Sequence, residues 1–338
     1  MSTLRPRAAG AAVLLAASLA FTACGTADEV GPGGEGDGGV IRVIDPGNAG
    51  PLAYAKREGI FEDRLAEVGA TIEWGGSYAS FTAAAEALKS GDVNLQQGAI
   101  SPAAGALAST DELRIFSVSD PLTDPAPVRD GLVVPAGSDV TGLADLEGRR
   151  VAVNQAGKGE YLLLRALEAE GVDPEEVDRV YLNPQEGAAA FGSGKVDAWW
   201  AIVNAYPEAV ASGADTIVTS RDVDDADLGI FAARTDLLEE HPEAVKVFFD
   251  VLNELIEEGQ SEPEKFQNVF LDQGPTAVDG DRLAEEIELT RATTVYRYPT
   301  EDDLAKVETV GRTFADHGVL PDPITASDVV FDLPAALS

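Results

Sequence analysis

A lysine between two glycines, placed just before a predicted helix, is the feature of this sequence with the clearest chemistry. Residues 154–171 read NQAGKGEYLLLRALEAEG, with Lys158 between Gly157 and Gly159. The first N–H groups of a helix have no intrahelical acceptor and favour an anion. Lys158 would add a point charge to these donors. The turn therefore predicts a site for a small negatively charged group, and the alternative is a surface lysine paired with Glu160.

Three further turns combine glycine with amide or hydroxyl side chains, and each joins a predicted strand to a predicted helix. Glycine lets the backbone approach a ligand closely, and amides and hydroxyls donate hydrogen bonds without carrying charge. A single turn of this kind is weak evidence, because glycine also occurs in turns for conformational reasons. The four turns together predict a shared ligand site with the candidate residues Gly47, Asn48, Ser77, Tyr78, Gln97, Ser101, Gln155, Gly157, Lys158, Gly159 and Glu160.

These turns belong to an alternation of short β-rich runs and helical patterns. Pro51 suits a first helical position, and Gly171 follows the last residue of a helical pattern. Repeated strand, turn and helix units indicate an α/β fold with parallel sheets and ligands beyond the carboxyl ends of the strands. The predicted strands are 40–44, 71–74, 93–97, 114–118, 132–134, 150–153, 179–182, 198–203 and 216–219.

The first 23 residues have the pattern of an export signal. A basic segment with Arg5 and Arg7 precedes a run of small and apolar residues that is too short to span a membrane. Residues 21–24, FTAC, resemble a bacterial lipobox with Phe in place of the usual Leu. That resemblance implies cleavage before Cys24 and a lipid anchor on it, and the alternative is an exported protein in which Cys24 is incidental.

Composition limits the function classes open to this chain. The 24 basic and 59 acidic residues give a formal net charge of −35, which argues against nucleic-acid binding, since that needs a basic footprint. A local anion site remains possible, because salt screens surface charge beyond about 8 Å. Cys24 is the sole cysteine, so no intrachain disulfide can form. The glycine-rich, acidic residues up to Gly39 predict a flexible tether.

Several enzyme and metal motifs are absent from the sequence. It has no G-x-S-x-G elbow, no phosphate loop and no Cys/His set for zinc. The acidic run 222–227 lacks the glycine and the closing acid of a calcium loop, so we expect a solvated connection there. We predict a binding protein with no metal and no cofactor, and not an enzyme.

Four runs resemble the aliphatic-sulfonate, nitrate and taurine family of ABC-importer solute-binding proteins. They are GNAGPLAYAKREGIF (47–61), GLVVPAGSDVTGLADLEGRRVAVNQAGKGEYLLLRAL (131–167), VDAWWAIVNAYPEA (196–209) and FAARTDLLEEHPEAV (231–245). The resemblance implies a two-lobed periplasmic-binding-protein-like fold with two hinge crossings and a mostly parallel sheet flanked by helices in each lobe. With the predicted signal peptide (1–23) and the tether (24–39) set apart, the resemblance divides the chain into the first lobe (40–134), the second lobe (135–229) and a return to the first lobe with C-terminal helices (230–338).

The same resemblance implies a function. Such proteins close on a small solute and deliver it to a membrane permease. We therefore expect an extracytoplasmic monomer, lipid-anchored at the outer face of the cell membrane, that binds a small organic anion. An aliphatic sulfonate is the first expectation, and nitrate or taurine types also fit. The alternatives are a receptor of the same fold for a thiamine-precursor pyrimidine or riboflavin, and a biosynthetic enzyme of that fold.

Two departures from the family pattern concern the ligand. The sulfonate branch usually has hydroxyl side chains and often a histidine where residues 155–160 stand here, so Lys158 and Glu160 take the place of hydroxyl donors. The family commonly shows Trp-Asp-Pro-Tyr where this chain has VNAY (203–206). Asn204 is a further candidate ligand residue, but it lacks the charge that an ammonium group would need. The resemblance therefore disfavours a taurine-like amine, unless Glu160 takes that role.

Aromatic side chains supply possible walls for the site. Trp199 and Trp200 are neighbours on a predicted strand and must point to opposite faces of the sheet. We expect one in the core and assign the cleft wall to Trp200. Tyr78 and Tyr161 are further wall candidates, with core packing as the alternative for each.

Overall fold

The structure is a computed structural model that describes residues 38–338, apart from 79, 123–124, 224–226 and 275. The predicted signal peptide, Cys24 and all but the end of the predicted tether lie outside the described residues. Within the described part, no helix is long and apolar enough to cross a membrane.

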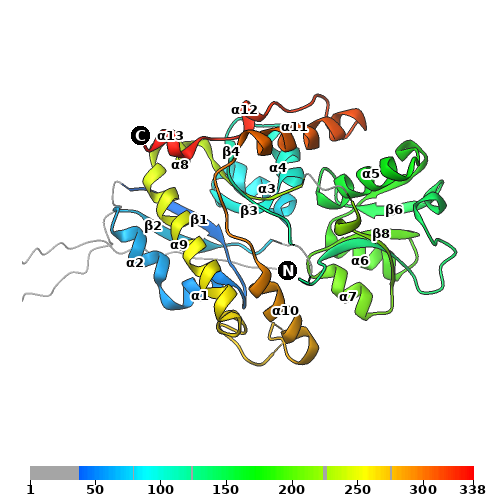
Figure 1. Cartoon of the computed structure of the whole chain (residues 1–338), viewed down its shortest axis with the longest axis horizontal. Coiled ribbons are helices and arrows are strands. Elements are labelled where there is room, and N and C mark those ends of the chain that lie inside the picture. The colour runs from blue at the N-terminus through cyan, green and yellow to red at the C-terminus, as the bar shows by residue number, and fades with distance from the viewer. Residues whose placement is uncertain (1–37, 79, 123–124, 224–226, 275) are drawn as a thin grey trace, which may run out of the picture. The chain divides into compact units, whose positions relative to one another are not determined.

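The described strands form three sheets in two lobes (Figure 1). We call the part built on β1–β4 and β10 the first lobe and the part built on β5–β9 the second lobe. The first lobe has a two-stranded parallel sheet of β1 (Val40–Ile44) and β2 (Thr71–Gly75), and a three-stranded sheet in the order β3 (Leu95–Ala99), β10 (Gly229–Arg234), β4 (Leu113–Ser119). The second lobe has a five-stranded sheet in the order β7 (Asp178–Tyr181), β6 (Arg150–Val153), β8 (Ala198–Ile202), β5 (Asp130–Val134), β9 (Asp215–Thr219).

The sheets are mixed, whereas the resemblance implied mostly parallel ones. β6 runs parallel to β7 and β8, but β5 is antiparallel to β8 and β9, and β10 is antiparallel to β3 and β4. Each of these two strands is the first after a crossing between the lobes, so the crossings reverse the strand direction. The pairing of β5 places it in the second sheet, although residues up to 134 were assigned to the first lobe.

Helices flank each sheet, and several begin with the residue types that favour a helix start. Pro51 begins α1, and Asn183 and Glu186 form a capping box at the start of α6. The first-lobe helices are α1 (Pro51–Glu58), α2 (Ile60–Ala66), α3 (Phe81–Ser90), α4 (Ile100–Leu107), α8 (Thr235–Glu240), α9 (Pro242–Ser261), α10 (Gly280–Ala292), α11 (Glu301–Asp316), α12 (Ala326–Val329) and α13 (Leu333–Ala336). The second-lobe helices are α5 (Lys158–Glu170), α6 (Pro184–Gly192) and α7 (Ala205–Ala211).

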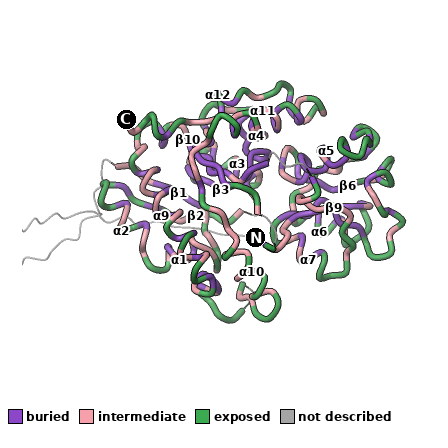
Figure 2. The backbone as a smooth tube through the Cα atoms, viewed as in Figure 1, coloured by how far each residue is buried: buried purple, intermediate pink, exposed green. Residues whose placement is uncertain are grey.

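One apolar core continues from the first lobe into the second. Ile100 of α4, Leu163 of α5 and Phe314 of α11 are all fully buried in it, and Figure 2 shows buried residues gathered along β3, α3 and α4. A Cβ at Gly105 of α4 would lie 2.6 Å from the Cβ of Ala156 in the second lobe, so the backbones meet closely. The lobes therefore share a buried apolar contact in addition to their two crossings.

Helix α11 strengthens this contact. The ring of Phe314 meets that of Tyr161 edge-on at 5.9 Å between centroids, which places Tyr161 in the core. His317 Nε2 lies 2.7 Å from Glu168 Oε1 at the end of α5. The returning chain thus braces the second lobe through its packing as well as through its covalent connection.

The start of α11 has a buried carboxylate with an altered pKa. Asp303 is 1% exposed and accepts hydrogen bonds from Thr300 N (2.8 Å), Thr300 Oγ1 (2.7 Å) and Arg297 Nη2 (3.1 Å). Burial alone would raise the pKa of Asp303, but the bonds from Arg297 and Thr300 outweigh it and hold that pKa below its usual value. The stabilisation is therefore present above the unfolded-state pKa, about 3.9, and is lost as the pH falls further.

Replacing this carboxylate should change both stability and its pH dependence. We expect Asp303→Asn to lower the free energy of unfolding by about 2 kcal/mol at pH 7, because charge-assisted hydrogen bonds are lost. The variant should also lose less stability than the wild type between about pH 5 and pH 3. Urea denaturation at several pH values measures both effects, with the exposed Asp302→Asn as control. Parallel pH profiles for wild type and Asp303→Asn would contradict this role.

Candidate functional site

A pocket of ≈ 640 Å³ lies between the lobes, beside both crossings. Its lining comes from the ends of β3 and β4, both crossing segments, the first residue of α5 and the end of α10 and residues after it. The charged residues of the described lining are Asp120, Arg129, Asp130, Lys158, Arg221 and Asp227. The pocket therefore offers both cations and carboxylates to a small polar ligand.

Lys158 lies in this pocket at the start of α5. Its Nζ is 3.3 Å from Oδ2 of Asp130, a residue that is only 6% exposed. The N-cap residue, Gly157, makes no side-chain capping bond. The carboxylate partner that the structure gives Lys158 is thus Asp130 at the start of β5, not Glu160.

Glu160 has a structural task instead. It is fully buried, and its Oε2 accepts a hydrogen bond from Ala156 N at 2.7 Å while its Oε1 accepts from Arg179 Nη1 at 3.1 Å and Tyr181 OH at 2.9 Å. Burial raises the pKa of Glu160 despite these bonds, and burial together with the Glu160 charge raises the pKa of Tyr181 to about 12. Ala156 has a left-handed φ of 49°. Glu160 therefore fixes the turn before α5 and does not line the pocket.

Close packing requires glycine at position 157 and leaves little room for a side chain at position 159. A Cβ at Gly157 would lie 1.7 Å from Asn154 Nδ2, and one at Gly159 would lie 3.3 Å from Trp200 Cβ. Gln155 is exposed and lies outside the lining. The glycines thus let the turn fold against Asn154 and β8.

Both tryptophans of β8 are buried. Trp200 is 1% exposed and belongs to the core shared by the lobes, and Trp199 packs against Phe191 at 5.8 Å between ring centroids. β8 is the middle strand of its sheet, with α5 on one face and α6 and α7 on the other, so each face is covered. Trp200, expected as a cleft wall, lies in the core.

The carboxylate of Asp227 lies at the start of α4 and binds one of its first N–H groups. Ser101 is fully buried, and its N and Oγ donate to Asp227 Oδ1 and Oδ2 at 2.7 and 2.8 Å. Asp227 is only 2% exposed. This end of the acidic run is therefore buried, whereas we expected the run to be solvated. Ser101 therefore anchors the second crossing and is not itself part of the lining.

The first two glycine turns also serve the local structure. Asn48 accepts hydrogen bonds from Phe270 N (2.9 Å) and Leu271 N (3.0 Å), and it donates to Leu271 O (2.8 Å) and Thr276 O (3.1 Å). Gly47 N donates to Asp45 Oδ1 at 2.8 Å within its own turn. Ser77 is exposed, and Tyr78 is half-buried against the shared core. These predicted site residues, Gly47, Asn48, Ser77 and Tyr78, lie outside the pocket lining.

Gln97 does line the pocket. Its Nε2 donates to the hydroxyl of Tyr296 at 2.8 Å, and burial raises the pKa of Tyr296 to about 12. Gln97 and Lys158 are thus the sequence-predicted residues that the structure brings to one pocket. Sequence reasoning missed Asp130 and Tyr296, because neither lies in a glycine turn.

Asn204 takes part in a polar bridge between the lobes. Its Oδ1 accepts from Arg129 Nη2 at 2.5 Å and from Arg282 Nη2 at 3.4 Å. Glu286 Oε1 of α10 accepts from Arg129 Nη1 at 2.9 Å and from Arg282 Nε at 3.2 Å. Val203, just before Asn204, has a left-handed φ of 54°, which is strained for a β-branched residue. We call Arg129, Asn204, Arg282 and Glu286 the polar bridge.

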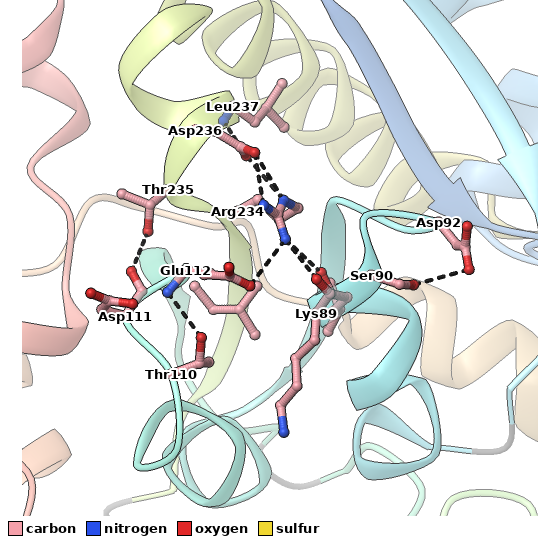
Figure 3. Close-up of polar contacts among 12 residues, drawn as sticks. Lys89, Ser90, Asp92, Thr110, Asp111, Glu112, Arg234, Thr235, Asp236 and Leu237 are labelled. Carbon is pink, nitrogen blue, oxygen red and sulfur yellow. Dashed lines mark hydrogen bonds and ion pairs between the residues drawn. The ribbon is translucent and has the colours of Figure 1, made fainter.

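A second hollow, of ≈ 550 Å³, lies in the first lobe near the start of β3 and the end of β10. Arg234 in its lining donates to Lys89 O at 2.9 Å and to Asp236 Oδ2 at 2.8 Å (Figure 3). Arg42 in the same lining donates to Glu73 Oε2 at 2.9 Å. Both guanidinium groups are held by carboxylates, so an anion would have to compete with them. The pocket between the lobes is the better candidate site.

Two lobes with a pocket between them define the class of periplasmic-binding-protein-like solute-binding folds. The chain belongs to the NMT1/THI5-like family, whose model matches residues 77–266. It is 30% identical over 253 residues, 73% of each chain, to a protein of Bacillus subtilis (strain 168) named for binding aliphatic sulfonates. It is also 30% identical over 214 residues, 62% of each chain, to the taurine-binding periplasmic protein of Escherichia coli (strain K12). These relatives confirm the resemblance seen in the sequence.

Solved structures confirm the α/β fold. The alkanesulfonate-binding protein SsuA from Xanthomonas axonopodis pv. citri, bound to MOPS, matches with a TM-score of 0.74 at 21% identity over 87% of this chain and 98% of that chain. The desulfurization enzyme DSZB has a similar fold, with a TM-score of 0.55 at 17% identity over 88% and 98% of the two chains. The fold therefore occurs in both binding proteins and an enzyme, while the sequence relatives named above are binding proteins.

The polar bridge should contribute measurably to stability. Arg129 and Glu286 have side chains only 15% and 16% exposed, so their ion pair is partly shielded from solvent. We expect Glu286→Gln to lower the free energy of unfolding by about 1–2 kcal/mol, and the exposed Glu285→Gln to change it by less than about 0.5 kcal/mol.

A double-mutant cycle with Arg129→Gln, read by urea denaturation, isolates the energy of the Arg129–Glu286 pair. A coupling energy near zero would show that the bridge does not hold the lobes together.

Proposed function

We propose that this chain is the solute-binding lipoprotein of an ABC importer and that it captures a small organic anion, first of all an aliphatic sulfonate, in the pocket between the lobes. The observation that carries the proposal is the position of Lys158, which lines the pocket at the start of α5. A sulfonate presents three acceptor oxygens, and cationic donors bind such groups by charge-assisted hydrogen bonds. Arg129 and Arg221 add positive charge to the same lining.

The lining comes from both lobes, which supports capture by closure. Gln97 and Tyr296 belong to the first lobe, and Lys158 and Asp130 belong to the second. A ligand that contacts both sets favours the closed arrangement by the contacts that exist only there. A micromolar dissociation constant corresponds to about −8 kcal/mol, which a few charge-assisted bonds can supply.

The relatives support a role in solute import. The proposal adds where the protein acts and which partner receives the solute. Export by residues 1–23 and lipidation of Cys24 would place the protein at the outer face of the cell membrane. There it would act as a monomer that delivers its solute to a permease. An aromatic solute such as riboflavin is less well matched, because Tyr296 is the sole aromatic residue of the described lining. Nothing in this proposal requires turnover of the solute.

Lys158 gives the sharpest test of anion binding. We expect Lys158→Gln to weaken ethanesulfonate binding at least about tenfold, because loss of a charge-assisted bond costs about 1.5–3 kcal/mol. Lys195→Gln, which changes an exposed lysine of the same lobe, should bind as the wild type does. Isothermal titration calorimetry measures both constants. Wild-type protein that binds riboflavin or a pyrimidine but no sulfonate would refute the proposal.

The membrane anchor can be tested separately. We expect the wild-type chain, expressed in a bacterium with lipoprotein processing, to sediment with membranes and to require detergent for release. Cys24→Ala should leave a protein in the aqueous extracytoplasmic fraction, because the acceptor of the lipid is gone, and Thr22→Ala should stay with the membranes. Release of the wild-type chain into the aqueous fraction without detergent would rule out lipidation at Cys24.

A further inference from the structure

We propose that Tyr296 is the residue of the first lobe that drives closure, by donating its phenol proton to the anionic group of the solute while Lys158 holds that group from the second lobe. The inference rests on the proposed function of the same pocket and adds the contact that draws the first lobe onto the ligand. The glycine turns of the sequence do not mark Tyr296, because it lies in the segment between α10 and α11.

The backbone of Tyr296 is held from two elements of the first lobe. Asn253 Oδ1 of α9 accepts from Tyr296 N at 2.8 Å, and Asn253 Nδ2 donates to Tyr296 O at 2.9 Å. The next residue, Arg297, exchanges backbone hydrogen bonds of 2.8 and 2.9 Å with Val118 of β4. The tyrosine is therefore fixed to the sheet of the first lobe, although its own segment forms no helix there.

The side chain of Tyr296 is equally well fixed. Its ring meets that of Phe231 of β10 edge-on at 4.8 Å between centroids, and the residue is 6% exposed. Its hydroxyl oxygen accepts from Gln97 Nε2 at 2.8 Å. Burial raises the pKa of Tyr296 to about 12, against the opposing effects of Ser119 and Gln97. The phenol therefore keeps its proton at neutral pH and is a rigid, uncharged donor.

The phenol proton is available to a ligand. A tyrosine hydroxyl can accept a hydrogen bond and donate one at the same time. Gln97 uses its accepting side, and no carboxylate or carbonyl oxygen of the described residues accepts from its donating side. Gln97 is exposed and lines the pocket together with Ser119 and Tyr296, so this hydroxyl lies at the pocket wall. An oxygen brought by the solute would be a well-placed acceptor.

A sulfonate can join the two lobes because it has three acceptor oxygens. Lys158, at the start of α5, would fasten it to the second lobe. That contact alone exists whether the lobes are open or closed, and a ligand favours closure only through contacts that the closed arrangement adds. A hydrogen bond from Tyr296 to the same anionic group is such a contact. Bonds to a charged partner are stronger than bonds between neutral groups.

The two arginines of the described lining are less suited to this role. Arg129 Nη1 donates to Glu286 Oε1 at 2.9 Å, and Arg221 Nη2 donates to Ala126 O. Both arginines lie on the segments that cross between the lobes, so a bond to either says little about how far the lobes have closed. Tyr296 is held on the sheet of the first lobe, and its distance from Lys158 changes with closure.

Calorimetry and small-angle X-ray scattering with ethanesulfonate test the donor. We expect Tyr296→Phe to weaken binding at least about tenfold, because the ring is kept and the donor is lost. At saturating ethanesulfonate the wild type should become more compact, and Tyr296→Phe should keep the radius of gyration of the free protein. The control is Tyr298→Phe, which changes a tyrosine outside the lining that stacks on Phe249, and it should behave as the wild type does.

Gln97 tests the orientation of the phenol. Gln97→Met keeps the length of the side chain but removes the donor that occupies the accepting side of Tyr296. We expect it to weaken ethanesulfonate binding about threefold by itself and to cause no further loss in the Tyr296→Phe background, because a residue that acts through another is not additive with it. Additive losses would contradict this role of the phenol.

The outcomes separate this inference from the proposed function. If the wild type binds ethanesulfonate and Tyr296→Phe binds it and becomes compact to the same extent, the role of Tyr296 is refuted while sulfonate capture stands. If the wild type binds no sulfonate, both fall together. A merely structural hydroxyl would change thermal unfolding but neither the dissociation constant nor the compaction of the folded protein. If Tyr296→Phe does not fold, unchanged affinity in Gln97→Met refutes the inference.

Discussion

The carboxylate of Glu160, buried beneath the turn before α5, is the interaction on which the site depends. It accepts a hydrogen bond from the N–H of Ala156, which has a left-handed φ, and it accepts two more from Arg179 and Tyr181 on β7. Because helix α5 begins two residues later, this network fixes where Lys158 enters the pocket. The burial that raises the pKa of Glu160 is tolerated because three donors compensate it.

The contact between the lobes combines a rigid part with a polar part. The shared core of α4, α5 and α11 is apolar, and it is closely packed at Gly105, where a Cβ would lie 2.6 Å from the Cβ of Ala156. The polar bridge and the pocket instead use side chains that can exchange partners. A ligand can therefore act on the polar part without disrupting the packed one, and closure need not rebuild the core.

Much of the fold could be predicted from the sequence, and less of the site. Strands 40–44 and 150–153 agree with β1 and β6, because short β-rich runs bounded by turn residues mark them locally. β10 was missed, since its centre, Ile230 to Ala233, is a continuous buried run without alternation. Gln97 and Lys158 were predicted because each lies in a turn between a strand and a helix, and such turns can be recognised from adjacent residues in the sequence. Tyr296 lies 199 residues from its partner Gln97, and only the folded chain brings them together.

The position of β10 has a consequence for how the chain becomes a folded protein. β10 lies between β3 and β4, so their sheet stays open until the residues after 228 have been synthesised. The second lobe, whose strands run from residue 130 to 219 without interruption, can form first. As the chain emerges from its N-terminus, β3 and β4 expose unpaired edges, and such edges invite association with other chains. The lobe that comes first along the chain is thus the last to be completed, and a chaperone would have most to protect there.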